Sequence, residues 1–117
     1  MLVRGVRGVD RVGAALGVAD ARDGAALISS CRALGSTELG LPLVPIVVAA
    51  RASRARPAAR GRHVAGVITL YPRAFADPLT LAFTLLHEIG HAAGFDEERA
   101  DAFASRMLFS PDGPEDI

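Results

Sequence analysis

The sequence predicts a single α+β domain over residues 1–117, with N-terminal helices, a small mixed sheet and two C-terminal helices. Three observations favour this fold. Apolar residues recur at helical intervals near both ends of the chain. Two runs rich in β-branched residues occupy the middle. The length of 117 residues is enough for one modest hydrophobic core.

The N-terminal third predicts two helices. Residues Met1–Val18 place apolar side chains at helix-like intervals, although four glycines weaken that helix. Asp20 is a candidate N-cap for a second helix, which we expect to stop at Gly35. The only cysteine, Cys31, lies in the apolar stripe of that helix, so we expect a buried apolar side chain and no intramolecular disulfide.

The middle of the chain predicts two strands. Leu43–Ala50 is the first, and Pro45 favours a place at the sheet edge or at the strand start. His63–Tyr71 is the second, and Pro72 ends it. If it lies at a sheet edge, this second strand is a candidate to pair with the backbone of an extended peptide. For its terminal residues, His63 and Tyr71, ordinary strand and packing roles are favoured.

The connector Arg51–Arg62 is basic, with five arginines among its twelve residues. Such a segment could bind an acidic partner or a phosphate backbone. No aromatic residue is interleaved to stack on bases, and short arginine runs are common, so a solvated hairpin loop is the favoured interpretation.

Charge and hydropathy exclude several classes of function. The formal net charge is zero, so no global field attracts nucleic acid or a membrane surface. The sequence contains neither a recognisable signal peptide nor a membrane-spanning segment. We therefore expect a cytoplasmic protein that does not bind nucleic acid directly.

The stretch Asp77–Gly94 predicts a buried helix. Asp77 is a good N-cap, Pro78 suits the first helical position, and Gly94 can close the C-terminus. The residues between them are apolar on nearly every side, which is typical of a helix in the core.

This helix contains the pentapeptide His87-Glu88-Ile89-Gly90-His91, an H-E-x-x-H motif. Residues four apart lie on the same face of a helix, so the two imidazoles can bind one metal ion. The glutamate beside them, Glu88, is the candidate general base that takes a proton from the attacking water. A metal would also explain polar side chains inside a buried helix.

A third ligand is expected on the next helix, which Asp96 can cap. Glu97 and Asp101 fall on its apolar side, where a merely solvated carboxylate is not expected. Glu97 is the candidate third ligand, and Asp101 would accept a hydrogen bond from a ligating histidine. Glu98 and Asp96 remain alternative ligands, and acids that complement the helix dipole are the competing explanation. Two imidazoles and one carboxylate suit Zn²⁺ best.

The stretch TLLHEIGHAAGFDEERADAFASRML resembles the ImmA/IrrE metallopeptidases, which have T-x-x-H-E-x-x-H on one helix and E-x-x-A-D/N-x-F-A on the next. The matching residues are Thr84, His87, Glu88, His91, Glu97, Ala100, Asp101, Phe103 and Ala104. The resemblance covers roughly the C-terminal half. Only five residues separate His91 from Glu97, fewer than the family usually has. The metzincin pattern H-E-x-x-H-x-x-G-x-x-H, the alternative, would also place its third ligand at Glu97.

The resemblance implies a small α+β domain with a gluzincin-like zinc site, in cytoplasmic proteins that cleave or inactivate a DNA-binding repressor. The first hypothesis is therefore a zinc endopeptidase that acts on a protein partner. The second is a non-catalytic regulatory or interaction protein whose metal is structural, and a third is a metal-free core helix. Glu88 separates the first two hypotheses, because a structural site does not need a general base.

Overall fold

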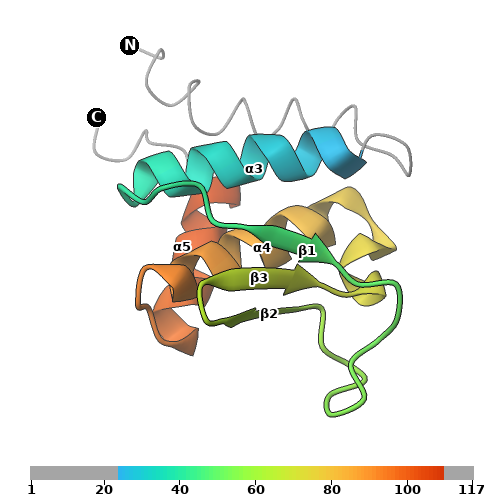
Figure 1. Cartoon of the computed structure of the whole chain (residues 1–117). Helices are drawn as coiled ribbons and strands as arrows, with labels where there is room; N and C mark the ends of the chain where they lie inside the picture. The colour runs from blue at the N-terminus through green and yellow to red at the C-terminus, as the bar shows by residue number, and fades with distance from the viewer. Residues whose placement is uncertain (1–23, 110–117) are drawn as a thin grey trace.

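A computed structural model describes residues 24–109, in which three helices and a small sheet pack together (Figure 1). The helices are α3 (Gly24–Glu38), α4 (Pro78–Ala92) and α5 (Glu97–Phe109). The strands are β1 (Ile46–Val48), β2 (Gly61–Val64) and β3 (Val67–Leu70), and the short 3-10 helix η2 (Pro72–Ala76) leads into α4. The predicted α+β fold is thus confirmed. The helix expected at Met1–Val18 and the cap expected at Asp20 lie outside the described residues.

The sheet is mixed, with strand order β1-β3-β2. β1 is parallel to β3, and β2 is antiparallel to it. The prediction of one continuous strand over His63–Tyr71 is wrong. Ala65 and Gly66 both have positive φ, 53° and 79°, which is the signature of a two-residue hairpin turn. This turn divides the segment into β2 and β3, and it makes β3 the central strand.

The first strand is shorter than the predicted Leu43–Ala50, but Pro45 directly precedes it and β1 lies at the sheet edge, as expected. The basic connector does not close a hairpin. It runs from β1 at one edge of the sheet to β2 at the other edge, and β3 lies between these two strands. Its last two residues, Gly61 and Arg62, belong to β2.

Gly35 does not stop α3, which continues to Glu38. The glycine is buried where α3 crosses α4, and a Cβ there would lie 3.0 Å from the terminal methyls of Ile89 and Leu86. It therefore allows close helix packing, and the chain turns instead at Gly40, where φ is +66°.

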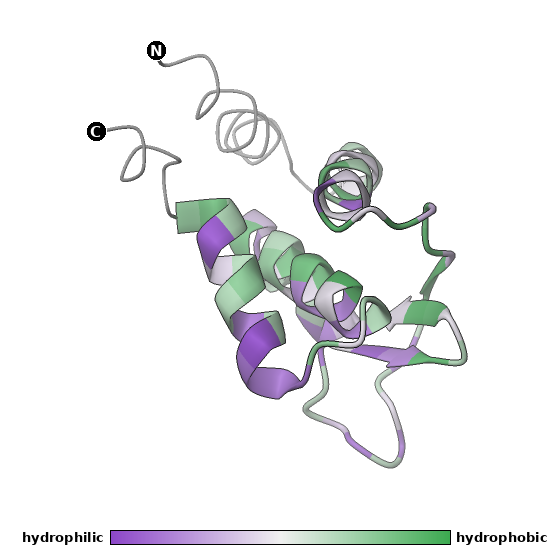
Figure 2. Cartoon of the chain, turned by 90° about the vertical axis from the view of Figure 1, so that its left-hand side faces the viewer, coloured by the Kyte–Doolittle hydropathy of each residue, from purple (hydrophilic) through white to green (hydrophobic). Residues whose placement is uncertain are grey.

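α4 is the centre of the molecule, packed against α3, α5 and the sheet (Figures 1 and 2). The core combines residues of all these elements, chiefly Leu27, Cys31, Ile68, Leu70, Leu85, Leu86, Ile89 and Phe103. Burial raises the pKa of the Cys31 thiol to about 12, so its expected role as a small apolar side chain fits its place. Across residues 24–109, every helix is too short or too polar to cross a bilayer.

Candidate metal centre

Local capping fixes where α4 begins and ends. Oδ1 of Asp77 accepts a hydrogen bond of 2.7 Å from the Thr80 N–H, and Pro78 follows in the first turn. Beyond the helix, Gly94 has a φ of +92° and reverses the chain. These three positions agree with the sequence prediction, and together they hold the histidine pair in the last turns of a buried helix.

The reversal brings α5 back against α4. Oδ1 of Asp96 accepts a 2.9 Å hydrogen bond from the Arg99 N–H, so Asp96 caps α5 as predicted and Glu97 is its first residue. The side chains of Glu97 and Asp101 are 78% and 59% exposed, so the expectation that they lie on the buried face is wrong. The buried face of α5 is formed by Ala100, Phe103, Ala104, Met107 and Leu108, and the two acids lie outside it.

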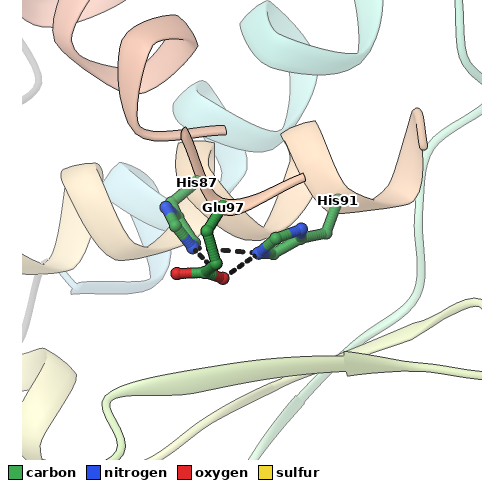
Figure 3. Close-up of side chains that lie close together, drawn as sticks. All are labelled: His87, His91 and Glu97. Carbon is green, nitrogen blue, oxygen red and sulfur yellow. Dashed lines mark hydrogen bonds and ion pairs between the residues drawn. The ribbon is translucent and has the colours of Figure 1, made fainter. Parts of the chain in front are cut away.

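Three side chains from the two helices converge on one point (Figure 3). Nε2 of His87 lies 3.0 Å from Nε2 of His91. Oε1 of Glu97 lies 2.6 Å from the His91 nitrogen and 3.2 Å from the His87 nitrogen. The imidazoles are 13% and 21% exposed, so both reach this point from a largely buried position.

The second ring nitrogen of each histidine faces an acceptor. Nδ1 of His91 lies 2.8 Å from the carbonyl oxygen of Phe95, which can only accept, so Nδ1 carries the proton. Nδ1 of His87 lies 2.7 Å from Oδ1 of Asp101, but this contact is not a hydrogen bond, and the buried nitrogen has no hydrogen-bond partner among the described residues. The carboxylate nevertheless favours a proton on that nitrogen. In the neutral rings, both Nε2 atoms therefore present lone pairs.

Two nitrogen lone pairs and a carboxylate oxygen thus face one another, and their repulsion is relieved either by a shared proton or by a metal ion. His87, His91 and Glu97 are able to hold a metal ion, since their donor atoms all lie within 4.8 Å of one another. Bonds of about 2.0–2.2 Å to a tetrahedral ion place its ligands roughly 3.3–3.6 Å apart. The side chains need to move outward by less than about 1 Å to reach this spacing.

Without an ion, the group shares a proton. Hydrogen bonding to His91 lowers the pKa of the exposed Glu97 carboxyl. Burial acts to lower the pKa of His91, but the Phe95 carbonyl and the Glu97 carboxylate outweigh it and raise that pKa. The metal-free site therefore favours a protonated His91 beside an ionised Glu97. A metal ion must displace that proton.

Glu88 is a separate, buried carboxylate, only 6% exposed. Burial raises its pKa, and the positive charge of the neighbouring histidines offsets part of this effect. It is outside the group formed by His87, His91 and Glu97, and it lines the adjacent cleft.

The cleft beside the site has a volume of about 510 Å³. One wall comes from α4 and α5 and includes Glu88, His91 and Glu97. The other wall comes from the connector and β2. It includes Ser53, Ala55, Arg56, Ala59, Gly61, Arg62, His63 and Val64, with Tyr71 following β3. The connector and β2 thus form one side of the candidate site.

Gly61 is a residue of this site that the sequence reasoning missed. A Cβ at Gly61 would lie 2.8 Å from Cγ2 of Thr84 and 3.2 Å from Cγ of Glu88. The missing side chain therefore allows β2 to lie directly against α4 at the candidate base. Its position in a basic, irregular connector gave no signal for this role, since the contact forms only on folding.

Other residues singled out in the sequence fall around the same cleft. His63 and Tyr71 both line it, although His63 contributes no donor to the metal group among the described residues. Glu98 and Asp96, the alternative ligands, also lie outside that group. Asp96 is occupied as the cap of α5, which leaves Glu97 as the acid that meets both histidines.

Comparisons of the chain with protein-family models, with curated proteins and with solved structures find no match.

Proposed function

We propose that this protein is a zinc-dependent endopeptidase of the ImmA/IrrE kind, which cleaves or inactivates a protein partner such as a DNA-binding repressor. One observation carries the proposal. Two imidazole lone pairs and a carboxylate converge beside a cleft that also contains a separate, buried carboxylate. A structural metal site needs the first three groups and not the fourth.

The ligands would be His87, His91 and Glu97, and Zn²⁺ is the ion that best suits this donor set. A bound zinc ion would supply Lewis-acid activation of the scissile carbonyl and of the attacking water. Asp101 and the Phe95 carbonyl would hold the histidine rings in the orientation and tautomer that ligation needs.

Glu88 would act as the general base. It lies in the cleft, next to a ligand in sequence but outside the ligand group. Burial raises its pKa, and a carboxylate whose pKa is raised is a stronger base. It would accept a proton from the water and pass it to the departing amine.

The edge strand that would hold the substrate is β2, whereas the sequence analysis favoured one strand that included the central β3. The Tyr71 N–H donates to the Arg60 carbonyl, 2.8 Å away, so these two residues are a hydrogen-bonded pair of the antiparallel ladder. Hydrogen-bonded pairs alternate with pairs that are not hydrogen-bonded, and Gly61 and His63 belong to the second kind. Gly61 and His63 therefore direct their backbone N–H and C=O groups away from β3. These groups could pair with an extended peptide that enters the cleft.

The substitution Glu88→Gln tests the reaction. It keeps the size of the side chain and removes the base, so we expect hydrolysis of fluorescein-labelled casein to fall by about 10²–10⁴-fold. Zinc content and circular dichroism should stay unchanged, because Glu88 is outside the ligand group.

The alternative function, a non-catalytic metal-containing regulator, predicts a different result. In that case the wild type would release no peptide at any zinc concentration, and Glu88→Gln would keep the biological activity of the wild type. A His91→Ala variant without bound zinc is the control that separates loss of metal from loss of the base.

A further inference from the structure

The two walls of the cleft differ in charge. Residues 39–76, which include the connector and the whole sheet, contain six arginines and no acidic residue. Arg56 and Arg62 line the cleft from this side, and both are exposed. Gly61 faces α4, and side chains alternate along a strand, so the Arg62 side chain leaves the other face of β2. Arg56 is therefore the arginine whose side chain can reach a ligand in the cleft. The opposite wall contributes Glu88 and Glu97. A ligand in the cleft therefore contacts a basic wall and an acidic wall at once.

The basic wall has no partner within the part of the chain that the structure describes. No ion pair among residues 24–109 includes Arg56 or Arg62. By contrast, Arg106 faces Glu38 at 3.4 Å, and Arg99 lies over the ring of Phe95. Within residues 24–109, no carboxylate therefore forms an ion pair with the cleft arginines, and a guanidinium is well suited to a carboxylate.

Arg56 is also held in a defined place. Its backbone N–H donates to Oγ of Ser53 at 3.1 Å, and its carbonyl accepts from the Ala59 N–H at 2.9 Å. These bonds fold the connector into a turn at the rim of the cleft. Less conformational entropy is then lost when a ligand binds.

We propose that the cleft selects a peptide segment with acidic side chains, one of whose carboxylates is bound by Arg56. This inference rests on the proposed function only in treating the peptide as substrate. An acidic peptide fits better than a nucleic acid for two reasons. The connector has no aromatic residue on which a base could stack. A nucleic acid also has a phosphate at every nucleotide, so phosphates would meet Glu97 on the other wall, whereas a peptide can present its uncharged backbone there.

Fluorescence anisotropy with two labelled peptides tests the proposal. The peptides share one sequence, except that three aspartates in the first are asparagines in the second. Binding is measured to full-length protein with the Glu88→Gln substitution, which prevents cleavage. We expect the aspartate peptide to bind about tenfold more tightly at low salt, and the preference to shrink as salt is added.

Two single variants locate the effect. R56Q should reduce the preference for aspartate by about threefold. The control R54Q removes the same charge from an exposed residue of the same connector that does not line the cleft, and it should keep the preference. Equal binding of the two peptides would overturn the proposal, as would an equal loss in both variants. Tighter binding of a single-stranded oligonucleotide than of the aspartate peptide would also overturn it.

The outcomes separate this inference from the proposed function. If wild-type protein binds the aspartate peptide selectively but cleaves neither peptide, the endopeptidase proposal fails and the inference holds. If it cleaves both peptides with equal efficiency, the inference fails and the endopeptidase proposal holds.

Discussion

His87 and His91 present the same ring nitrogen to Glu97, but different acceptors hold their other nitrogens. His91 faces the backbone carbonyl of Phe95, which no substitution can remove. His87 faces the side chain of Asp101, which can be changed. Mutagenesis can therefore test what orients the His87 ring, but not what orients the His91 ring.

Replacement of Asp101 by alanine should weaken zinc binding by about 10–100-fold, because the His87 ring loses the acceptor that orients it. Competition with a chromophoric chelator measures the affinity. Asp101→Asn removes the same charge but keeps an oxygen acceptor, so it should lose less than the alanine variant. Equal losses in the two variants would show that charge alone matters, and wild-type affinity in both would remove Asp101 from the site.

At the scale of elements, the contact between β2 and α4 sets the width of the site. Gly61 lies against Thr84 and Glu88, so any side chain at this position pushes the edge strand away from the candidate base. A peptide paired with β2 would lie near Glu88 only if this short distance between β2 and α4 is kept.

The substitution Gly61→Ala should lower the free energy of unfolding by about 1–3 kcal/mol, because its Cβ overpacks the contact with Thr84. Urea denaturation measures this change. Hydrolysis of labelled casein should fall as well, with zinc affinity unchanged, because β2 supplies no ligand.

A matched second substitution tests the geometry. Thr84→Ser removes the methyl group that the new Cβ would meet and keeps the hydroxyl, so Gly61→Ala/Thr84→Ser should recover part of the lost stability. The account of this contact is wrong if the double variant is destabilised by the sum of the two single effects.

At the scale of the whole molecule, the sequence predicted local features better than long-range ones. Asp77, Asp96 and Gly94 mark helix boundaries through bonds to near neighbours, so their roles are readable from the sequence. The candidate ligands could be named for the same reason, since all three lie within eleven consecutive residues.

The remaining features depend on tertiary packing. Gly35 resembles a helix stop, but it is a contact point between α3 and α4. The turn at Ala65-Gly66 lacks the asparagine or aspartate that usually signals such a hairpin. Because that turn was missed, the sequence did not predict that β2 would form the wall opposite Glu88.

The central claim is that Glu97 completes a zinc site with His87 and His91. Isothermal titration of zinc into the wild type and two variants, Glu97→Gln and Glu98→Gln, tests it most directly. The account predicts one zinc per wild-type chain, a loss of affinity of more than about 100-fold for Glu97→Gln, and wild-type affinity for Glu98→Gln. A wild type that binds no zinc, or a Glu98 variant that loses as much affinity as the Glu97 variant, would contradict it.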